Sequence, residues 1–186
     1  MSKTLSRLIV SIGAMLAIGA AAPALAQKVK LETSAGDIVV ELDAAKAPKS
    51  VENFLQYVKA GHYNGTVFHR VISNFMIQGG GMTADLKQKP TRAPIGLESR
   101  NGLTNQRGTL ALARTSDPNS ATAQFFINVK DNDFLNQAQS QDGQGYAVFG
   151  KVISGMDVVD RIKATPTGPG DVPLQPILIK NATVEK

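Results

Sequence analysis

Hydrophobic and polar residues alternate early in the chain, and this alternation predicts a β-hairpin. Residues 29–33 (Val-Lys-Leu-Glu-Thr) place apolar side chains on one face and polar side chains on the other, as a half-buried strand does. Residues 34–37 (Ser-Ala-Gly-Asp) have the composition of a turn, and residues 38–42 (Ile-Val-Val-Glu-Leu) resume as a strand. We therefore expect two antiparallel strands joined by a short turn.

The next segment has a helical period instead. Four apolar residues recur at i, i+3, i+4 and i+7, the spacing of one helix face: Val51, Phe54, Leu55 and Val58. Pro48 suits the first turn of a helix, where its missing N–H leaves no partner unsatisfied. Gly61 favours the end of the helix. The pattern predicts an amphipathic helix whose aromatic stripe faces the core.

The rest of the chain has mainly strand patterns. Apolar runs predict strands at residues 108–113, 124–129, 146–153 and 176–184. Ser154 followed by Asp157 resembles a capping box and predicts a helix to about residue 163, with Met156, Val159 and Ile162 facing inward. Two irregular loops cover residues 82–107 and 131–145. Many short strands, two helices and glycine-rich connections are typical of a closed antiparallel barrel with helices outside or over its ends.

The stretch 68–81 has apolar residues on both expected faces. With a period of two, Phe68, Arg70 and Ile72 share one face of the first run, and Val67, His69 and Val71 share the other. In the second run Phe75 and Ile77 point one way, and Met76 and Gln78 point the other. A sheet with one buried face needs no apolar residues on its second face unless something covers that face. An arginine among these residues suggests that the second face is a binding site.

The first 26 residues have the features of a cleaved signal peptide. Lys3 and Arg7 precede an apolar run at residues 8–22, and Ala24-Leu25-Ala26 forms a small-x-small cleavage site before Gln27. The alternative is a membrane anchor, but the run is shorter than the roughly 20 residues of a spanning helix. We expect residues 1–26 to be removed and residues 27–186 to form one domain.

Composition and charge limit the environment and the partners of this domain. The protein has 186 residues, of which 42% are hydrophobic and 19% charged, as expected for a single domain with its own core. Without Lys3 and Arg7, 18 basic residues remain against 15 acidic ones, a mild excess with no basic run that would indicate nucleic-acid binding. The chain has no cysteine, so an exported form does not depend on disulfides. We expect a periplasmic monomer without stable membrane association.

Several catalytic classes lack the residues that they need. The chain has two histidines and no cysteine, so no cluster of metal ligands is evident and no cofactor is expected. The glycines at 79–81 are not followed by Lys-Ser/Thr, which excludes a phosphate-binding loop. No Gly-x-Ser-x-Gly motif occurs, so a hydrolase nucleophile elbow is not supported.

Taken singly, the remaining candidate residues have ordinary structural explanations. Gln124 and Phe126 share a face of the run Gln-Phe-Phe-Ile, which is also what a plain barrel strand would show. An isolated strand arginine such as Arg70 is commonly solvated or ion-paired. His69 is expected to be a hydrogen-bonded structural histidine, and Met76 a core residue.

Together these residues resemble the cyclophilins, a family of peptidyl-prolyl cis/trans isomerases. The resemblance covers nearly all of the mature chain and is closest to the bacterial exported members. It rests on five motifs in order: residues 68–72 (FHRVI), 75–80 (FMIQGG), 108–114 (GTLALAR), 120–127 (SATAQFFI) and 148–152 (VFGKV). The resemblance implies an eight-stranded antiparallel barrel capped by two helices, in agreement with the fold class expected from the pattern.

The resemblance also implies roles for particular residues. Arg70 corresponds to the catalytic arginine. Nine further residues match positions that bind the peptide: Phe75, Met76, Gln78, Ala113, Gln124, Phe126, Phe134, Leu135 and Tyr146. Phe134 stands where the family often has tryptophan, a cyclosporin contact, and Tyr146 stands where it often has histidine. The implied partners are unfolded or partly folded proteins that contain Xaa-Pro.

Two other functions use a similar fold. A chaperone module could bind proline peptides in the same groove without turnover, but it would not need Arg70. A small-molecule barrel of the lipocalin kind would need an open interior, whereas Phe125, Ile127, Phe75 and Ile77 are expected to fill it.

Overall fold

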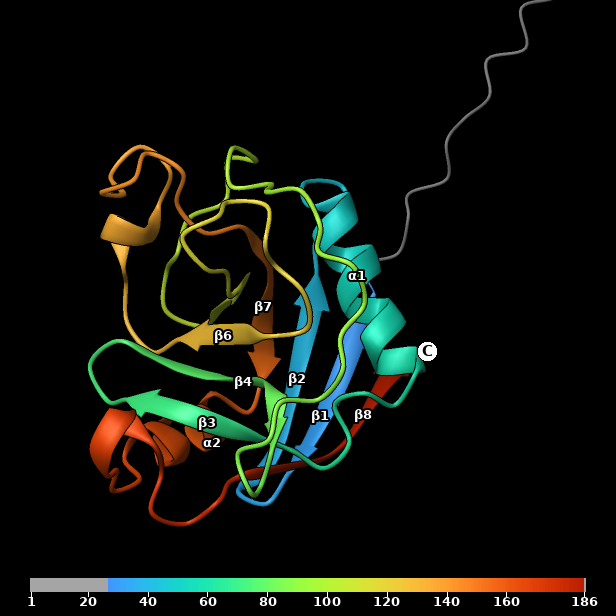
Figure 1. The fold of residues 1–186 in the computed structure, drawn as a ribbon, viewed down its shortest axis with the longest axis vertical. Coiled ribbons are helices and arrows are strands. Elements are labelled where there is room, and N and C mark those ends of the chain that lie inside the picture. Colours follow the sequence, from blue (N-terminus) through green and yellow to red (C-terminus); the bar gives the residue numbers. More distant parts are fainter. Residues whose placement is uncertain (1–26, 186) are drawn as a thin grey trace, which may run out of the picture.

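The computed structural model describes residues 27–185, so the expected signal peptide lies outside the described residues. Eight antiparallel strands close into a barrel in the order β1-β2-β7-β5-β6-β4-β3-β8 (Figure 1). The strands are β1 (Lys28–Thr33), β2 (Gly36–Leu42), β3 (Thr66–Ile72), β4 (Met76–Thr83), β5 (Thr109–Leu112), β6 (Phe125–Asn128), β7 (Val148–Ser154) and β8 (Leu178–Glu185). The expected barrel and its eight strands are confirmed.

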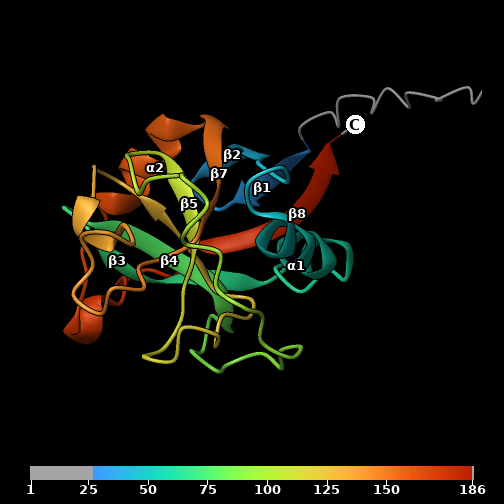
Figure 2. The ribbon, with the colours of Figure 1, turned by 90° about the horizontal axis from the view of Figure 1, so that it is seen from above.

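Two α-helices pack on opposite sides of this barrel, as Figures 1 and 2 show together. Helix α1 (Pro48–Lys59) lies along β8, and its Phe54 ring meets the rings of Tyr63, Phe125 and Phe149 inside the barrel. Helix α2 (Met156–Lys163) lies against β2 and buries Val159 and Ile162. Neither described α-helix has the length and apolar character needed to cross a membrane.

The start of α2 differs from the expected capping box. Ser154 is the last residue of β7, and the residue before the helix is Gly155, with φ 88° and ψ 22°. Among residues 27–185 no side chain caps this helix. A left-handed backbone favours glycine, so the chain turns from strand to helix through Gly155 rather than through a serine cap. Met156 is only partly buried, and Val158 joins the core beside Val159.

The alternation expected across residues 68–78 is wrong at two places. The register of β3 against β4 shifts on both sides of Phe68, so the ring enters the barrel core while Arg70 remains half exposed outside. A bulge of this kind breaks the period of two. Phe75 belongs to the turn before β4, closed by its N–H to Ile72 O at 3.0 Å, and it packs outside the barrel while Ile77 packs inside.

The barrel interior is nevertheless filled, as a lipocalin-like pocket would not be. Ile77, Ile127 and Leu110 lie opposite one another on β4, β6 and β5, and all three have no exposed surface. Phe68 and Phe125 add aromatic rings 6.2 Å apart. Side chains therefore occupy the space that a small-molecule barrel would leave for its ligand.

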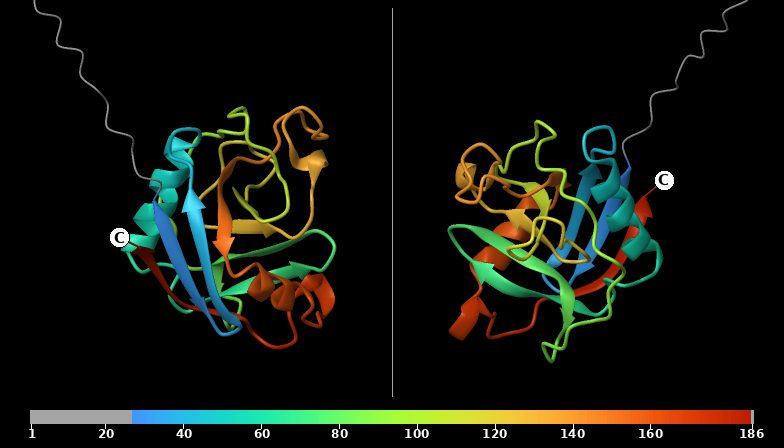
Figure 3. Two further views of the ribbon diagram at one scale, coloured as in Figure 1. Left: turned by 180° about the vertical axis from the view of Figure 1, so that it is seen from behind. Right: turned by 45° about the horizontal axis from the view of Figure 1, so that its top comes forward.

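One long loop is attached to helix α1, and the other lies on the far side of the barrel. The Glu98 carboxylate accepts hydrogen bonds from the backbone N–H groups of Lys49 and Ser50, at 3.1 and 2.8 Å, in the first turn of α1. This contact satisfies free N–H groups at the helix start. The loop of residues 131–145 contains a 3-10 turn, Asp133–Leu135, and lies on the side of the barrel away from α1 in both views of Figure 3.

Candidate active site

A row of five residues crosses the outside of the barrel. Arg70 on β3 is paired with Gln78 on β4, and Gln78 is paired with Phe126 on β6. Phe126 is paired with Ala111 on β5, and Ala111 with Val148 on β7. Directly opposed residues of antiparallel strands project from the same face of a sheet. The cation, the amide and the aromatic ring therefore share one face.

An apolar cluster, separate from the barrel core, covers this face. It consists of Met76, Ala111, Phe126, Leu135 and Val148, with Ile72, Phe75, Leu103, Ala113 and Tyr146 packed against it. We call these ten residues the outer cluster. Six of the ten site residues expected from the sequence belong to it: Phe75, Met76, Ala113, Phe126, Leu135 and Tyr146. The second apolar face expected from the strand pattern therefore exists, with five buried residues and five that are only partly buried.

Polar groups lie at the Arg70 edge of the outer cluster. The Nε2 group of Gln78 donates a hydrogen bond to Oε1 of Gln124 at 2.8 Å. This bond leaves the Oε1 atom of Gln78 able to accept a hydrogen bond from a bound chain, while the Gln124 side chain also lies close enough to His69 to influence its pKa. The Arg70 side chain is 42% exposed, and its Nε lies 3.5 Å from the Asp171 carboxylate.

Aromatic rings pack in pairs on the same face. Phe134 is 54% exposed and lies against Phe75, with ring centroids 5.4 Å apart. Tyr146 meets Phe126 edge-on at 5.7 Å. The expected residues thus lie on the outer face of the barrel, where the charged and amide groups of Arg70, Gln78 and Gln124 accompany a group of aromatic rings of which Phe134 is exposed.

Four buried asparagines hold these aromatic rings in place, a feature that sequence reasoning missed. Asn132 Nδ2 donates to the backbone carbonyl of Phe75 at 2.8 Å and to Oδ1 of Asn128 at 2.7 Å. Asn128 Nδ2 donates to Oδ1 of Asn105 at 3.2 Å, and Asn105 bonds Oδ1 of Asn136 through its backbone N–H at 2.7 Å. Buried amides need such partners. The chain of bonds fixes the turn that carries Phe134 and Leu135.

Arg114 supports Tyr146 from the side. Its guanidinium is almost fully buried, lies 4.5 Å from the Tyr146 ring centroid and donates to Gly145 O through Nε at 2.9 Å. It is also ion-paired with Asp142. A hydrogen bond from the Gln144 N–H, followed by the one from Arg114, lowers the pKa of Asp142. Arg114 falls near a position that is asparagine in the family, but the loop beside it differs in length, so that role is not assigned to it; here it supports the outer cluster.

His69 is less well satisfied than expected. Its side chain is buried, and its Nδ1 atom has no hydrogen-bond partner among the described residues. Burial lowers the pKa of His69, and the positive charge of Arg70 lowers it further. The imidazole is therefore held in its neutral form.

We expect the free energy of unfolding to fall as the pH is lowered from 7 to 5. The unfolded chain takes up a proton on histidine below about pH 6.5, whereas buried His69 resists protonation until lower pH, so acid favours the unfolded state. Above pH 7 both states carry neutral imidazole and the effect vanishes. Urea unfolding of the wild type and of His69→Gln at pH 7 and pH 5 measures this loss of stability. The variant should lose less stability in acid, and equal losses would contradict the assignment to His69.

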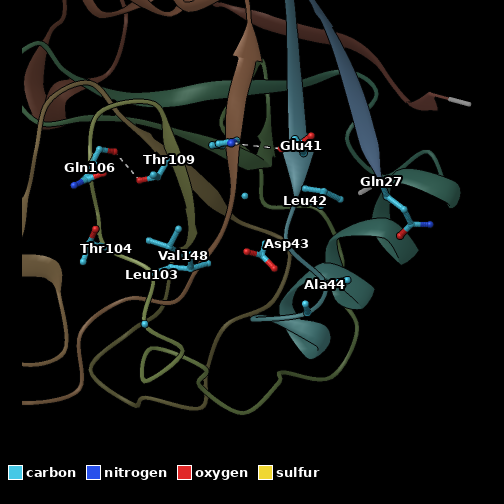
Figure 4. A pocket seen from close by; sticks show the side chains of 14 residues that line it. Gln27, Glu41, Leu42, Asp43, Ala44, Leu103, Thr104, Gln106, Thr109 and Val148 are labelled. Carbon is cyan, nitrogen blue, oxygen red and sulfur yellow. Dashed lines mark hydrogen bonds and ion pairs between the residues drawn. The ribbon is translucent and has the colours of Figure 1, made fainter. Parts of the chain in front are cut away.

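A cavity of about 520 Å³ lies behind the outer cluster. Figure 4 shows Leu103 and Val148 side by side at its wall, across from Asp43 and Leu42. Leu103 and Val148 belong to the outer cluster, but none of the ten expected site residues lines the cavity. It therefore adjoins the candidate site without being part of it. Among the described residues no group of His, Asp or Glu side chains could hold a metal ion.

Comparison with known proteins agrees with this geometry. The family model "Cyclophilin type peptidyl-prolyl cis-trans isomerase/CLD" matches residues 28–184. The peptidyl-prolyl cis-trans isomerase cyp18 of Streptomyces antibioticus is 62% identical over 161 residues, which cover 84% of this chain and 97% of that protein. Peptidyl-prolyl cis-trans isomerase B of Escherichia coli (strain K12) is 55% identical over 163 residues, covering 85% and 99%.

Solved structures share the fold. A cyclophilin type peptidyl-prolyl cis-trans isomerase of Cryptosporidium parvum is 28% identical with a TM-score of 0.74, covering 87% of this chain and 98% of that chain. A structure of the same protein in the presence of the dipeptide Ala-Pro is 29% identical with a TM-score of 0.73, covering 86% and 99%. The family model matches nearly all of the described chain, and the relatives and the closed barrel agree with it. The chain therefore belongs to the cyclophilin family and is a peptidyl-prolyl cis-trans isomerase.

Proposed function

We propose that residues 27–186 accelerate rotation about Xaa-Pro bonds in exported proteins that are still folding, with Arg70 as the catalytic residue. The observation that carries this proposal is the row that places Arg70 and Gln78 beside Phe126 on one face. The features of residues 1–26 support export to the periplasm. The Ala-Pro dipeptide used with the Cryptosporidium protein supports Xaa-Pro as the substrate class.

The chemistry of the reaction suits this set of residues. Rotation about a peptide bond is slow because the nitrogen lone pair is delocalised into the carbonyl, with a barrier of roughly 18–20 kcal/mol. For Xaa-Pro both isomers are populated, and they exchange in tens to hundreds of seconds. In the twisted state the lone pair is localised on a pyramidal prolyl nitrogen. Catalysis then requires no nucleophile and no metal, only groups that bind the twisted state more tightly than either isomer.

Arg70 would stabilise that nitrogen. Its guanidinium is always charged and presents several N–H donors in a rigid plane. A donor aimed at the localised lone pair interacts weakly with the planar amide, whose lone pair is delocalised, and strongly with the twisted one. The interaction is therefore specific to the transition state, as rate acceleration demands.

The remaining residues would hold the substrate. The proline ring would pack on the outer cluster, over Met76, Phe126 and Leu135, which are its buried central residues. Gln78 and Gln124, whose side chains bond each other, would also form hydrogen bonds with the peptide backbone. Lowering the barrier by about 6–7 kcal/mol would give roughly a 10⁵-fold acceleration, and several such contacts can share that amount.

The first test is isomerisation of an Ala-Pro peptide, in large excess, by residues 27–186. A protease that cleaves only the trans form is present throughout, so the slow phase of cleavage measures the conversion of cis peptide into trans. We expect the slow phase of cleavage to accelerate in proportion to protein concentration. Peptide binding without acceleration would instead favour the chaperone module. For export, fractionation of cells that make the full chain should place the protein in the periplasm with Gln27 as its first residue. A cytoplasmic full-length chain would contradict that part of the proposal.

A further inference from the structure

The Arg70 guanidinium has an acidic neighbour from a distant part of the chain. The Oδ2 atom of Asp171 lies 3.5 Å from Arg70 Nε. Asp171 ends the short 3-10 turn Pro169–Asp171, which packs against β3. Within residues 27–185, Asp171 is the only ion-pair partner of Arg70. Nothing in the local sequence around either residue indicates this contact.

Backbone hydrogen bonds and specific backbone angles define the conformation around Asp171. Gly170 and Asp171 are consecutive residues with positive φ, 74° and 61°. Aspartate is one of the few residues other than glycine that adopt this conformation readily. The Gly168 N–H bonds Val172 O at 2.8 Å, and the Leu174 N–H bonds Pro166 O at 2.9 Å. These two hydrogen bonds close the loop and keep the Asp171 carboxylate on the side of β3.

The Asp171 carboxylate approaches Arg70 at Nε, as an ion pair at 3.5 Å without a hydrogen bond, and no other described residue forms an ion pair with the guanidinium. Arginine carries five N–H donors in a fixed plane, and four of them are on the two Nη atoms. A carboxylate held near Nε attracts the guanidinium toward one orientation without occupying those four donors. An arginine side chain that is half exposed otherwise samples many rotamers, and ordering it on binding substrate costs free energy.

We infer that Asp171 is a positioning residue that orients the Arg70 guanidinium for the prolyl nitrogen. This inference rests on the proposed catalytic role of Arg70. Asp171 itself touches neither the substrate nor the reacting atoms. Its effect should therefore fall on kcat, because it prepares an interaction that is made only in the transition state.

An Asp171 carboxylate could also lower kcat instead of raising it, so measuring kcat without the carboxylate distinguishes the two effects. A negative charge beside Arg70 partly neutralises the field that the guanidinium exerts on the nitrogen. If neutralisation dominated, removal of the carboxylate would raise kcat. If an exposed ion pair had no net effect, as many have none, removal would leave kcat unchanged.

The experiment compares Asp171→Asn and Asp171→Gly with the wild type on an Ala-Pro peptide. Asparagine keeps the shape and tolerates positive φ, and glycine removes the side chain where the backbone favours it, so both should fold. Asp157→Asn is the matched control, because it breaks an exposed ion pair with Arg161 on α2, outside the outer cluster. We expect both Asp171 variants to lower kcat about 3- to 10-fold with KM within about twofold, and the control to match the wild type.

Two further readouts separate positioning from a general structural effect. In about 1 M NaCl, where charges are screened beyond roughly 3 Å, the ratio of wild-type to Asp171→Asn activity should shrink. On an Arg70→Ala background, Asp171→Asn should cause no further loss. Unchanged or higher kcat in both Asp171 variants, with Arg70→Ala inactive, would overturn this inference alone. Full activity of Arg70→Ala would overturn the proposed mechanism instead.

Discussion

Replacing Arg70 with alanine is expected to lower kcat/KM for an Ala-Pro peptide by about 10²-fold or more, a loss of at least ~2.7 kcal/mol of transition-state stabilisation. The substitution removes the one cation in the row that contains Gln78 and Phe126. Because the Arg70 side chain is 42% exposed, its removal should change the free energy of unfolding by no more than about 0.5 kcal/mol. The protease-coupled assay gives the activity, and urea unfolding gives the stability.

Two variants control this result. Arg161→Ala removes another exposed arginine, paired with Asp157 on α2, and should retain wild-type activity. Arg70→Lys keeps the charge but loses the planar fork of donors, so we expect activity between those of the wild type and Arg70→Ala. If Arg70→Ala and Arg161→Ala were equally active, the guanidinium would have no part in the rotation step.

Replacing Gly155 with alanine is expected to destabilise the fold by about 3 kcal/mol, since a left-handed L-residue costs roughly 1–2 kcal/mol and overpacking adds a similar amount. Gly155 has φ 88°, and a Cβ there would lie 2.3 Å from the carbonyl oxygen of Asp37. That oxygen belongs to β2, so the strand itself would have to move. Urea unfolding at neutral pH measures the loss.

Gly65→Ala is the matched control for this substitution. Gly65 has a similar φ of 77°, but a Cβ there would meet nothing within 4 Å. It should cost only the backbone term, about 1–2 kcal/mol. Equal losses in the two variants would show that the turn from β7 into α2 tolerates the side chain, contrary to the packing described above.

Local patterns were enough to predict most of the barrel. The alternation in β1 and β2 and the helical spacing in α1 reflect which side chains face the core, and burial of those side chains is what stabilises the elements. Register was the exception. The shifts beside Phe68 turn that ring inward, and a bulge leaves no mark in a sequence that is apolar on both faces.

The candidate site was predictable only in part, for a related reason. The ten expected residues lie on short motifs, and adjacent strands bring those motifs together. The supports of the site come from elsewhere in the chain. Asp171 reaches Arg70 from the 3-10 turn that precedes β8, and Asn105 bonds to Asn128 and Asn136 from a different loop. Such contacts depend on the folded arrangement of distant segments, which neither periodicity nor spacing encodes.

The most direct test of the account separates binding from rotation in one sample. NMR exchange spectroscopy on an Ala-Pro peptide reports binding through peptide shifts and rotation through the rate of exchange between cis and trans signals. With residues 27–186 we expect both. With Arg70→Ala we expect affinity within about threefold of the wild type but exchange slower by about 10²-fold or more, since the charge acts on the transition state. Equal exchange rates at equal binding would contradict the central claim that Arg70 drives the rotation.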